Sequence, residues 1–114
     1  MIELNKKKSK NEIPVEIKNE IDKIVNDFNK QIIKGKNYFY VTRYKGEYLF
    51  LDRAEYGGSP ICRLKYNGEI NNWGFAIYKY SNDGYDSEEW FFPGSDKVDG
   101  TVEGAMKAGL EAYP

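Results

Sequence analysis

Basic and aromatic side chains alternate along the middle of the chain. Aromatic rings stack on nucleobases and cationic groups neutralise phosphates, so the two types on one surface are typical of single-strand binding. Two sets show this pattern: Arg43, Arg53, Arg63, Lys65 and Lys79, and Tyr38, Tyr40, Tyr48, Trp73 and Tyr78. We select as the candidate binding set Tyr38, Tyr40, Arg63, Lys65, Trp73 and Tyr78. The alternative is that the charges lie on strand edges and keep an aromatic sheet soluble.

An acidic segment at residues 81–89 (SNDGYDSEE) offers oxygen ligands of the kind that calcium prefers. If Gly84 were the sixth position of an EF-hand loop, the first would be Lys79 and the twelfth Trp90, and neither is a ligand. The segment therefore favours a solvated hairpin loop, and we predict no metal site. Whether the loop takes a cation is left open.

The chain contains no histidine and a single cysteine, Cys62. These absences exclude Ser-His and Cys-His nucleophile pairs, imidazole bases, intramolecular disulfides and most zinc sites. Cys62 lies inside a predicted strand, so we expect a buried structural thiol. Carboxylates remain as candidate general acids or bases, but their spacing in the sequence does not show which of them would lie close together. We therefore predict no catalytic residues and no cofactor, and an enzyme ranks third among the functions considered.

The N-terminal third predicts an arm followed by a helix. Residues 1–12 are polar and lysine-rich, and we expect a flexible arm that adds little to folding. A helix of about 20 residues should begin near Pro14 and end at Gly35. Its apolar stripe has helical spacing: Ile17, Ile21, Ile24, Phe28 and Ile32.

Residues 37–92 have a strand pattern. Runs at 37–44 and 47–53, separated by Lys45-Gly46, predict a hairpin with two largely apolar faces. Further strands are expected at 60–66, with Ile61, Arg63 and Lys65 on its wet face, at 73–80, and at 88–92 after the loop 81–87. The pattern predicts a four- to five-stranded antiparallel meander, because no helix lies between the strands to cross over the sheet.

The C-terminal helix is expected at about 101–112, capped by Asp99 or Thr101. It is rich in small residues, including Gly104 and Ala108, which predicts close approach to the sheet or to another helix. The fold class is α+β: an N-terminal helix, the antiparallel meander and a C-terminal helix, in one domain spanning residues 13–114.

Charge changes sign along the chain. Residues 1–36 hold nine basic and six acidic residues, residues 37–80 hold six and four, and residues 81–114 hold two and eight. The total of −1 argues against a general nucleic-acid binder. No apolar run approaches the roughly 20 residues of a membrane span, and the N-terminus has no signal-peptide pattern, so we expect a cytoplasmic protein without membrane contact.

A sheet with one face in water needs only one apolar face, whereas the predicted hairpin has two. We therefore expect both helices on one face and a partner on the other. The favoured function is a small interaction module that forms a homo-oligomer, most simply a dimer, or binds a protein partner through its aromatic sheet face. The alternative is single-stranded nucleic-acid binding by the sheet aromatics with arginine and lysine.

Overall fold

A computed structural model describes residues 12–54 and 58–114. The first helix, α1 (Val15–Gln31), begins directly after Pro14, as predicted. The Pro14 carbonyl accepts the hydrogen bond from Lys18 N at 3.0 Å. Proline is favourable there because its missing N–H would have no helical partner. Gly35, at φ +84°, lies in the turn beyond the helix rather than at its end.

The predicted apolar stripe of α1 is confirmed at four positions and wrong at the fifth. The four that pack into or against the core are Ile17, Ile21, Ile24 and Phe28. Ile32 is 50% exposed, whereas Ile33 is buried. Helical spacing no longer applies there, because α1 ends at Gln31.

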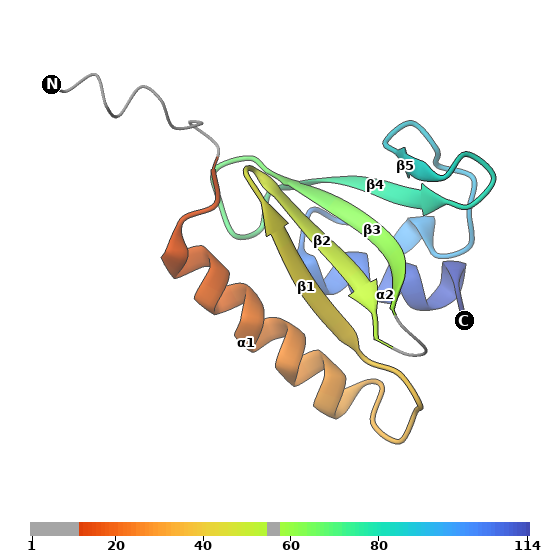
Figure 1. Cartoon of the computed structure of the whole chain (residues 1–114), viewed down its shortest axis with the longest axis horizontal. Helices are drawn as coiled ribbons and strands as arrows, with labels where there is room; N and C mark the ends of the chain where they lie inside the picture. Colours follow the sequence, from red (N-terminus) through yellow and green to blue (C-terminus); the bar gives the residue numbers. More distant parts are fainter. Residues whose placement is uncertain (1–11, 55–57) are drawn as a thin grey trace, which may run out of the picture.

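The predicted α+β meander is confirmed: five antiparallel strands follow one another in space as they do in sequence (Figure 1). The strands are β1 (Tyr40–Lys45), β2 (Tyr48–Arg53), β3 (Ser59–Tyr66), β4 (Trp73–Lys79) and β5 (Gly84–Asp86).

The first hairpin turns one residue later than predicted. Lys45 pairs with Tyr48, so the turn is Gly46-Glu47. Gly46 has φ +59°, the left-handed conformation that tight hairpin turns require. Each β1 residue therefore pairs with a β2 residue two positions further along the chain than predicted. Because side chains alternate with a period of two, every residue stays on its predicted face. Arg43 and Arg53 accordingly lie on opposite faces.

Two strand predictions are wrong. The fifth strand is β5, inside the segment expected to be a loop, and residues 88–92 form no strand. Ile61 is buried, with 1% exposure, instead of lying on the wet face. The register of β2 against β3 shifts between Leu51 and Asp52, and Ile61 is the residue that this bulge leaves without a partner. A bulge re-aims the side chain, here toward the core.

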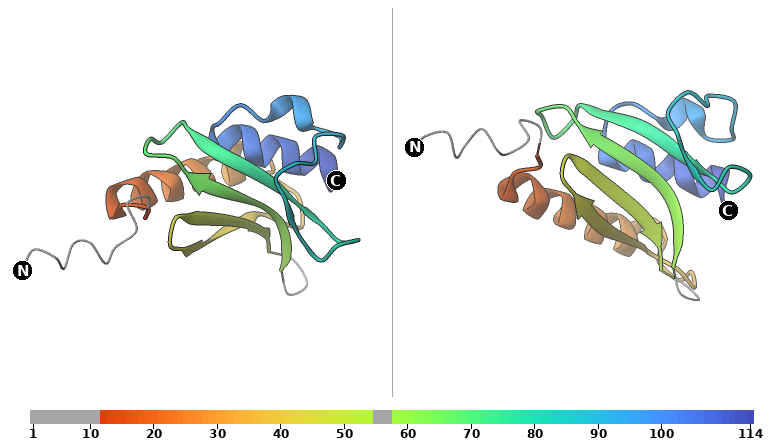
Figure 2. Two further views of the ribbon diagram at one scale, coloured as in Figure 1. Left: turned by 90° about the horizontal axis from the view of Figure 1, so that it is seen from above. Right: turned by 45° about the horizontal axis from the view of Figure 1, so that its top comes forward.

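Both helices lie against the same face of the sheet (Figure 2). The C-terminal helix, α2 (Val102–Ala112), follows the short 3-10 helix η2 (Ser95–Lys97). It packs on β3 and β4, while α1 packs on β1 and on α2. Between the two layers lie fully buried side chains such as Ile21, Leu64 and Met106. Among the described residues, no helix covers the opposite sheet face.

Small residues let α2 approach its neighbours, as the sequence predicts. A Cβ at Gly109 would press on the Tyr40 hydroxyl and lie 2.6 Å from Ile61 Cγ2. Gly104 instead faces the preceding loop, where a Cβ would lie 2.6 Å from the Lys97 carbonyl. Thr101 caps the helix, because its hydroxyl accepts a hydrogen bond from Gly104 N at 2.9 Å.

The Asn29 side chain joins α1 to the backbone of β1. The Asn29 amide donates to the Tyr40 carbonyl at 2.9 Å, and its oxygen accepts from Tyr40 N at 2.8 Å. The helix is thereby held to the strand at a fixed register.

In the part of the chain that the structure describes, no helix combines the length and apolar character needed to cross a membrane. The predicted arm lies, except for Glu12, outside the described residues.

Candidate functional site

The sheet face away from the helices, which we call the open face, carries alternate residues of all five strands. Strand register places on it Val41, Arg43, Lys45, Tyr48, Phe50, Asp52, Arg63, Lys65, Gly74, Ala76, Tyr78 and Tyr85. Four of these are cationic and one is acidic. The open face is therefore positive, although the chain as a whole has a charge of −1.

Arg43, at one side of the open face, forms an ion pair with Asp52. Its Nε lies 2.6 Å from Asp52 Oδ2 and its Nη2 lies 3.2 Å from Asp52 Oδ1, a two-pronged ion pair. The guanidinium carbon lies 4.5 Å from the centre of the Phe50 ring. The hydrogen bond to Asp52 raises the pKa of Arg43. Its charge is thus largely balanced by Asp52.

Arg63 lies at the centre of the open face between two tyrosine rings. Its guanidinium carbon is 4.5 Å from the centre of the Tyr48 ring and 5.4 Å from that of Tyr85. Tyr85 also contacts Phe50, with ring centres 5.4 Å apart. Within residues 12–54 and 58–114, no carboxylate forms an ion pair with Arg63. This guanidinium is held by aromatic contacts, and its hydrogen-bonding groups remain available to an anion.

Two hollows, each of about 440 Å³, adjoin this stack. Tyr48 and Arg63 line both. The first continues across Lys65 and the small residues of β4 to Trp90, and the second continues to Lys45. The open face therefore has a hollow on each side of the Arg63–Tyr48 pair.

The structure brings together only part of the predicted binding set. Arg63, Lys65 and Tyr78 lie on the open face. The hydrogen bond to Asp83 is the main reason that the pKa of Tyr78 rises to about 12.

The other three predicted residues lie on the helix side. Tyr40 is 2% and Trp73 is 4% exposed, so neither has surface to offer a ligand. The Tyr40 hydroxyl donates to the Met106 carbonyl at 2.7 Å, and burial raises its pKa. Tyr38 stacks with Arg53, whose guanidinium carbon lies 4.3 Å from its ring centre.

Sequence reasoning left out three aromatic residues that line the site. Phe50 follows Tyr48 at a spacing of two along β2. Residues at this spacing share one face of a strand, and this was the signal that could have identified Phe50. Tyr85 belongs to β5, which lies in the segment that the sequence predicts to be a loop. Trp90 lies in residues 88–92, which the sequence predicts to be a strand but which instead border a hollow.

Two candidate chemistries lie elsewhere. Cys62 is fully buried, as predicted, and burial raises the pKa of its thiol. The acidic segment uses its carboxylates internally: Asp83 accepts from Tyr78, and Glu89 pairs with Lys79. In the described part of the chain, no three histidine, cysteine or acidic side chains are placed to hold a metal ion.

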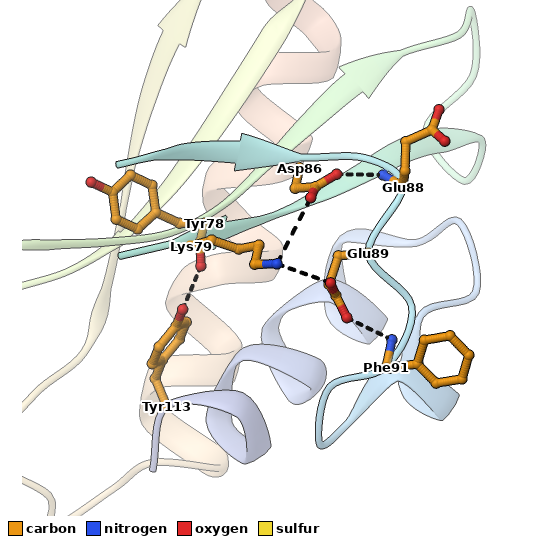
Figure 3. A network of polar contacts seen from close by, with 7 residues as sticks. All are labelled: Tyr78, Lys79, Asp86, Glu88, Glu89, Phe91 and Tyr113. Atoms are coloured by element: carbon orange, nitrogen blue, oxygen red, sulfur yellow. Dashed lines mark hydrogen bonds and ion pairs between the residues drawn. The ribbon is translucent and has the colours of Figure 1, made fainter. Parts of the chain in front are cut away.

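The pairing of Lys79 with Glu89 fixes the segment that carries Trp90 (Figure 3). Lys79 Nζ lies 3.0 Å from Glu89 Oε1 and 4.0 Å from Asp86 Oδ2. The second Glu89 oxygen accepts from Phe91 N at 3.0 Å. The hydrogen bond from Lys79 lowers the pKa of Glu89, and the same bond raises that of Lys79. Trp90 thus lies between two anchored neighbours.

The chain matches no protein-family model, no curated protein and no solved structure with which it was compared.

Proposed function

We propose that this protein is a binding domain whose open face takes single-stranded nucleic acid. The observation that carries the proposal is the open face itself. Its strands hold four cationic side chains among aromatic rings and one carboxylate, and Glu47 of the first turn borders the second hollow. Phosphates would contact Lys45, Arg63 and Lys65, and bases would contact the aromatic rings.

A single strand suits this face better than a duplex. Bases in a duplex are already stacked and paired, and a wide sheet does not reach their edges. The faces of unpaired bases are free to stack on side chains such as Tyr48 and Trp90.

The acidic part of the chain does not oppose this ligand. α2 lies on the other side of the sheet (Figure 2), and its acidic residues Glu103 and Glu111 are on that side. The Asp86 and Glu89 carboxylates are engaged with Lys79. A phosphate chain that follows β2 and β3 therefore meets mainly positive charge.

Fluorescence anisotropy with a labelled oligonucleotide at low salt tests the proposal. Arg63→Glu with Lys65→Glu should abolish binding. Lys23→Glu with Lys30→Glu on α1 is the matched control, because it changes the net charge equally on exposed residues of the other layer. The proposal fails if both double variants weaken binding equally, or if the native chain binds no oligonucleotide.

Salt dependence provides a second measure. Arg43 is balanced by Asp52, which leaves Lys45, Arg63 and Lys65 to neutralise phosphates. Three contacts give a slope of log K against log salt of roughly −2 for a single strand. A slope near zero would contradict phosphate binding.

Self-association is the second candidate, on a different surface. Phe91 is 96% and Tyr80 56% exposed. Exposed aromatics of this kind are enriched in protein interfaces. The open face suits a dimer less well, because two-fold symmetry would bring like charges together.

Sedimentation at micromolar concentration tests this second candidate. A dimer would sediment as twice the chain mass of 13.2 kDa, and Phe91→Ser would return it to the monomer. Arg63→Glu with Lys65→Glu should leave such a dimer intact. A native chain that is monomeric throughout would remove this candidate.

A further inference from the structure

The first hollow, which we call the slot, is bordered by β3, β4 and the segment after β5. Its floor is β4 at Gly74 and Ala76, the two small residues of that strand that line it. Arg63 and Lys65 border it on the β3 side, and Trp90 borders it from the segment after β5. Its volume of about 440 Å³ lies within the range usual for small-ligand sites, about 300–1,000 Å³.

Trp90 is supported from the protein side and open toward solvent. Its ring centre lies 6.3 Å from that of Phe75 and 6.5 Å from that of Phe92. The residue is nevertheless 47% exposed. The neighbouring Glu89 is held by Lys79 and by Phe91 N, and these bonds fix the chain on both sides of Trp90.

We infer that this slot holds one nucleobase of the bound strand, stacked on Trp90, with the adjoining phosphates on Arg63 and Lys65. The inference rests on the proposed function and adds to it, because it assigns one base and its phosphates to a particular hollow of the open face. Cations on one side of the slot and an indole on the other match the two parts of a nucleotide.

Tryptophan fluorescence reports directly on this contact. Trp73, the other tryptophan, is 4% exposed and gives a constant background. A single-stranded oligonucleotide should quench the emission of the native protein. Trp90→Phe should remove the quenching but retain most of the affinity, because phenylalanine still stacks. Trp90→Ala should weaken binding by roughly 5- to 150-fold, the loss expected for one stacked base.

An abasic oligonucleotide of equal length separates this inference from the proposed function. It should bind more weakly than the base-bearing strand and cause no quenching. If both strands bind equally tightly to the native chain, the base slot is wrong and phosphate binding stands. If neither strand binds, the proposed function itself fails.

Filling the slot is the second test. Gly74→Val should reduce the affinity for the base-bearing strand to that for the abasic strand, with little effect on the abasic strand. Gly74→Ala is the control for folding, since its Cβ would make ordinary contacts, 3.6 Å from Lys65 Cβ and 3.8 Å from Asn67 Nδ2. Unchanged discrimination between the strands in a folded Gly74→Val protein overturns the inference. If Gly74→Val does not fold, Trp90→Ala decides. A free mononucleotide that binds as tightly as the strand would also overturn it, because the slot would then be a nucleotide site.

Discussion

Arg53 and Arg63 show how location decides what the same side chain does. Both guanidinium groups stack on a tyrosine ring, Arg53 on Tyr38 and Arg63 on Tyr48. Arg53 lies on the helix side, is 7% exposed and donates to the Tyr113 carbonyl beyond α2. Arg63 lies on the open face. Arg53 therefore contributes to the fold, whereas Arg63 lies on the surface to which we assign the proposed ligand.

Lysine substitution at each arginine separates these two roles. Arg53→Lys should lower the free energy of unfolding by about 1–3 kcal/mol, because the buried Arg53 loses its planar guanidinium and the Tyr113 carbonyl loses that donor. Arg63→Lys should change stability by less than about 0.5 kcal/mol, as surface substitutions usually do. Urea denaturation measures both. Equal losses would mean that the open-face stack is structural.

Low pH should weaken the Lys79–Glu89 ion pair that holds the segment around Trp90. The pKa of Glu89 is lowered in the fold, so its contribution to stability is present above the unfolded value, near 4.5, and is lost as pH falls below it. Melting temperatures between pH 3 and 6 should fall less steeply for Glu89→Gln than for the native chain. Glu88→Gln is the control, since the Glu88 side chain takes no part in the Lys79 pairing. Parallel curves for all three proteins would contradict this role.

At the scale of elements, the packing of α2 depends on one glycine. Gly109 faces the Tyr40 hydroxyl and lies where a Cβ would be 2.6 Å from Ile61 Cγ2. Glycine costs a helix about 1 kcal/mol relative to alanine, and the close approach to the sheet offsets that cost.

Gly109→Ala should therefore destabilise the protein although alanine is the better helix former. Overpacking of this kind costs about 1–3 kcal/mol. Lys107→Ala, an exposed position of the same helix, should change stability little. Chemical denaturation compares the two, and a more stable Gly109→Ala protein would show that α2 can move away from the sheet without loss.

The elements were predictable where local chemistry alone determines them. The first helix follows from its apolar spacing and from Pro14, and the strand faces follow from alternation along each strand. The position of the first turn, the bulge that buries Ile61 and the location of β5 depend on pairing between strands. No residue-by-residue pattern contains that information.

The candidate site was only half predictable for a related reason. Both faces of the first hairpin are apolar, so alternation could not tell which face the helices would cover. Once α1 and α2 cover the face with Tyr40 and Trp73, these two become core, and Arg63 and Lys65 remain at the surface. Trp90 joins them only because the chain after β5 returns to the hollow.

For the whole molecule, the two layers separate the groups that stabilise the fold from the proposed binding surface. The core lies between the helices and one face of the sheet, and the open face adds few fully buried groups to it. Substitutions on the open face should therefore change affinity more than folding.

A bound strand should in turn stabilise the whole fold by mass action. At a free oligonucleotide concentration of 100 times Kd, the free energy of unfolding should rise by about 2.7 kcal/mol. Thermal melts with and without oligonucleotide measure the increase. The Arg63→Glu, Lys65→Glu protein should show none, and an equal rise in that variant would place the ligand elsewhere.

The bonds between Asn29 and Tyr40 have a consequence for how the protein resists aggregation. β1 is the outermost strand of the sheet, and an outermost strand is a template onto which another chain can add. The Asn29 amide occupies the N–H and the carbonyl of Tyr40, as a neighbouring strand would. A chain that paired with Tyr40 would first have to break both bonds, so the contact that fixes α1 also blocks one end of this edge to strand addition.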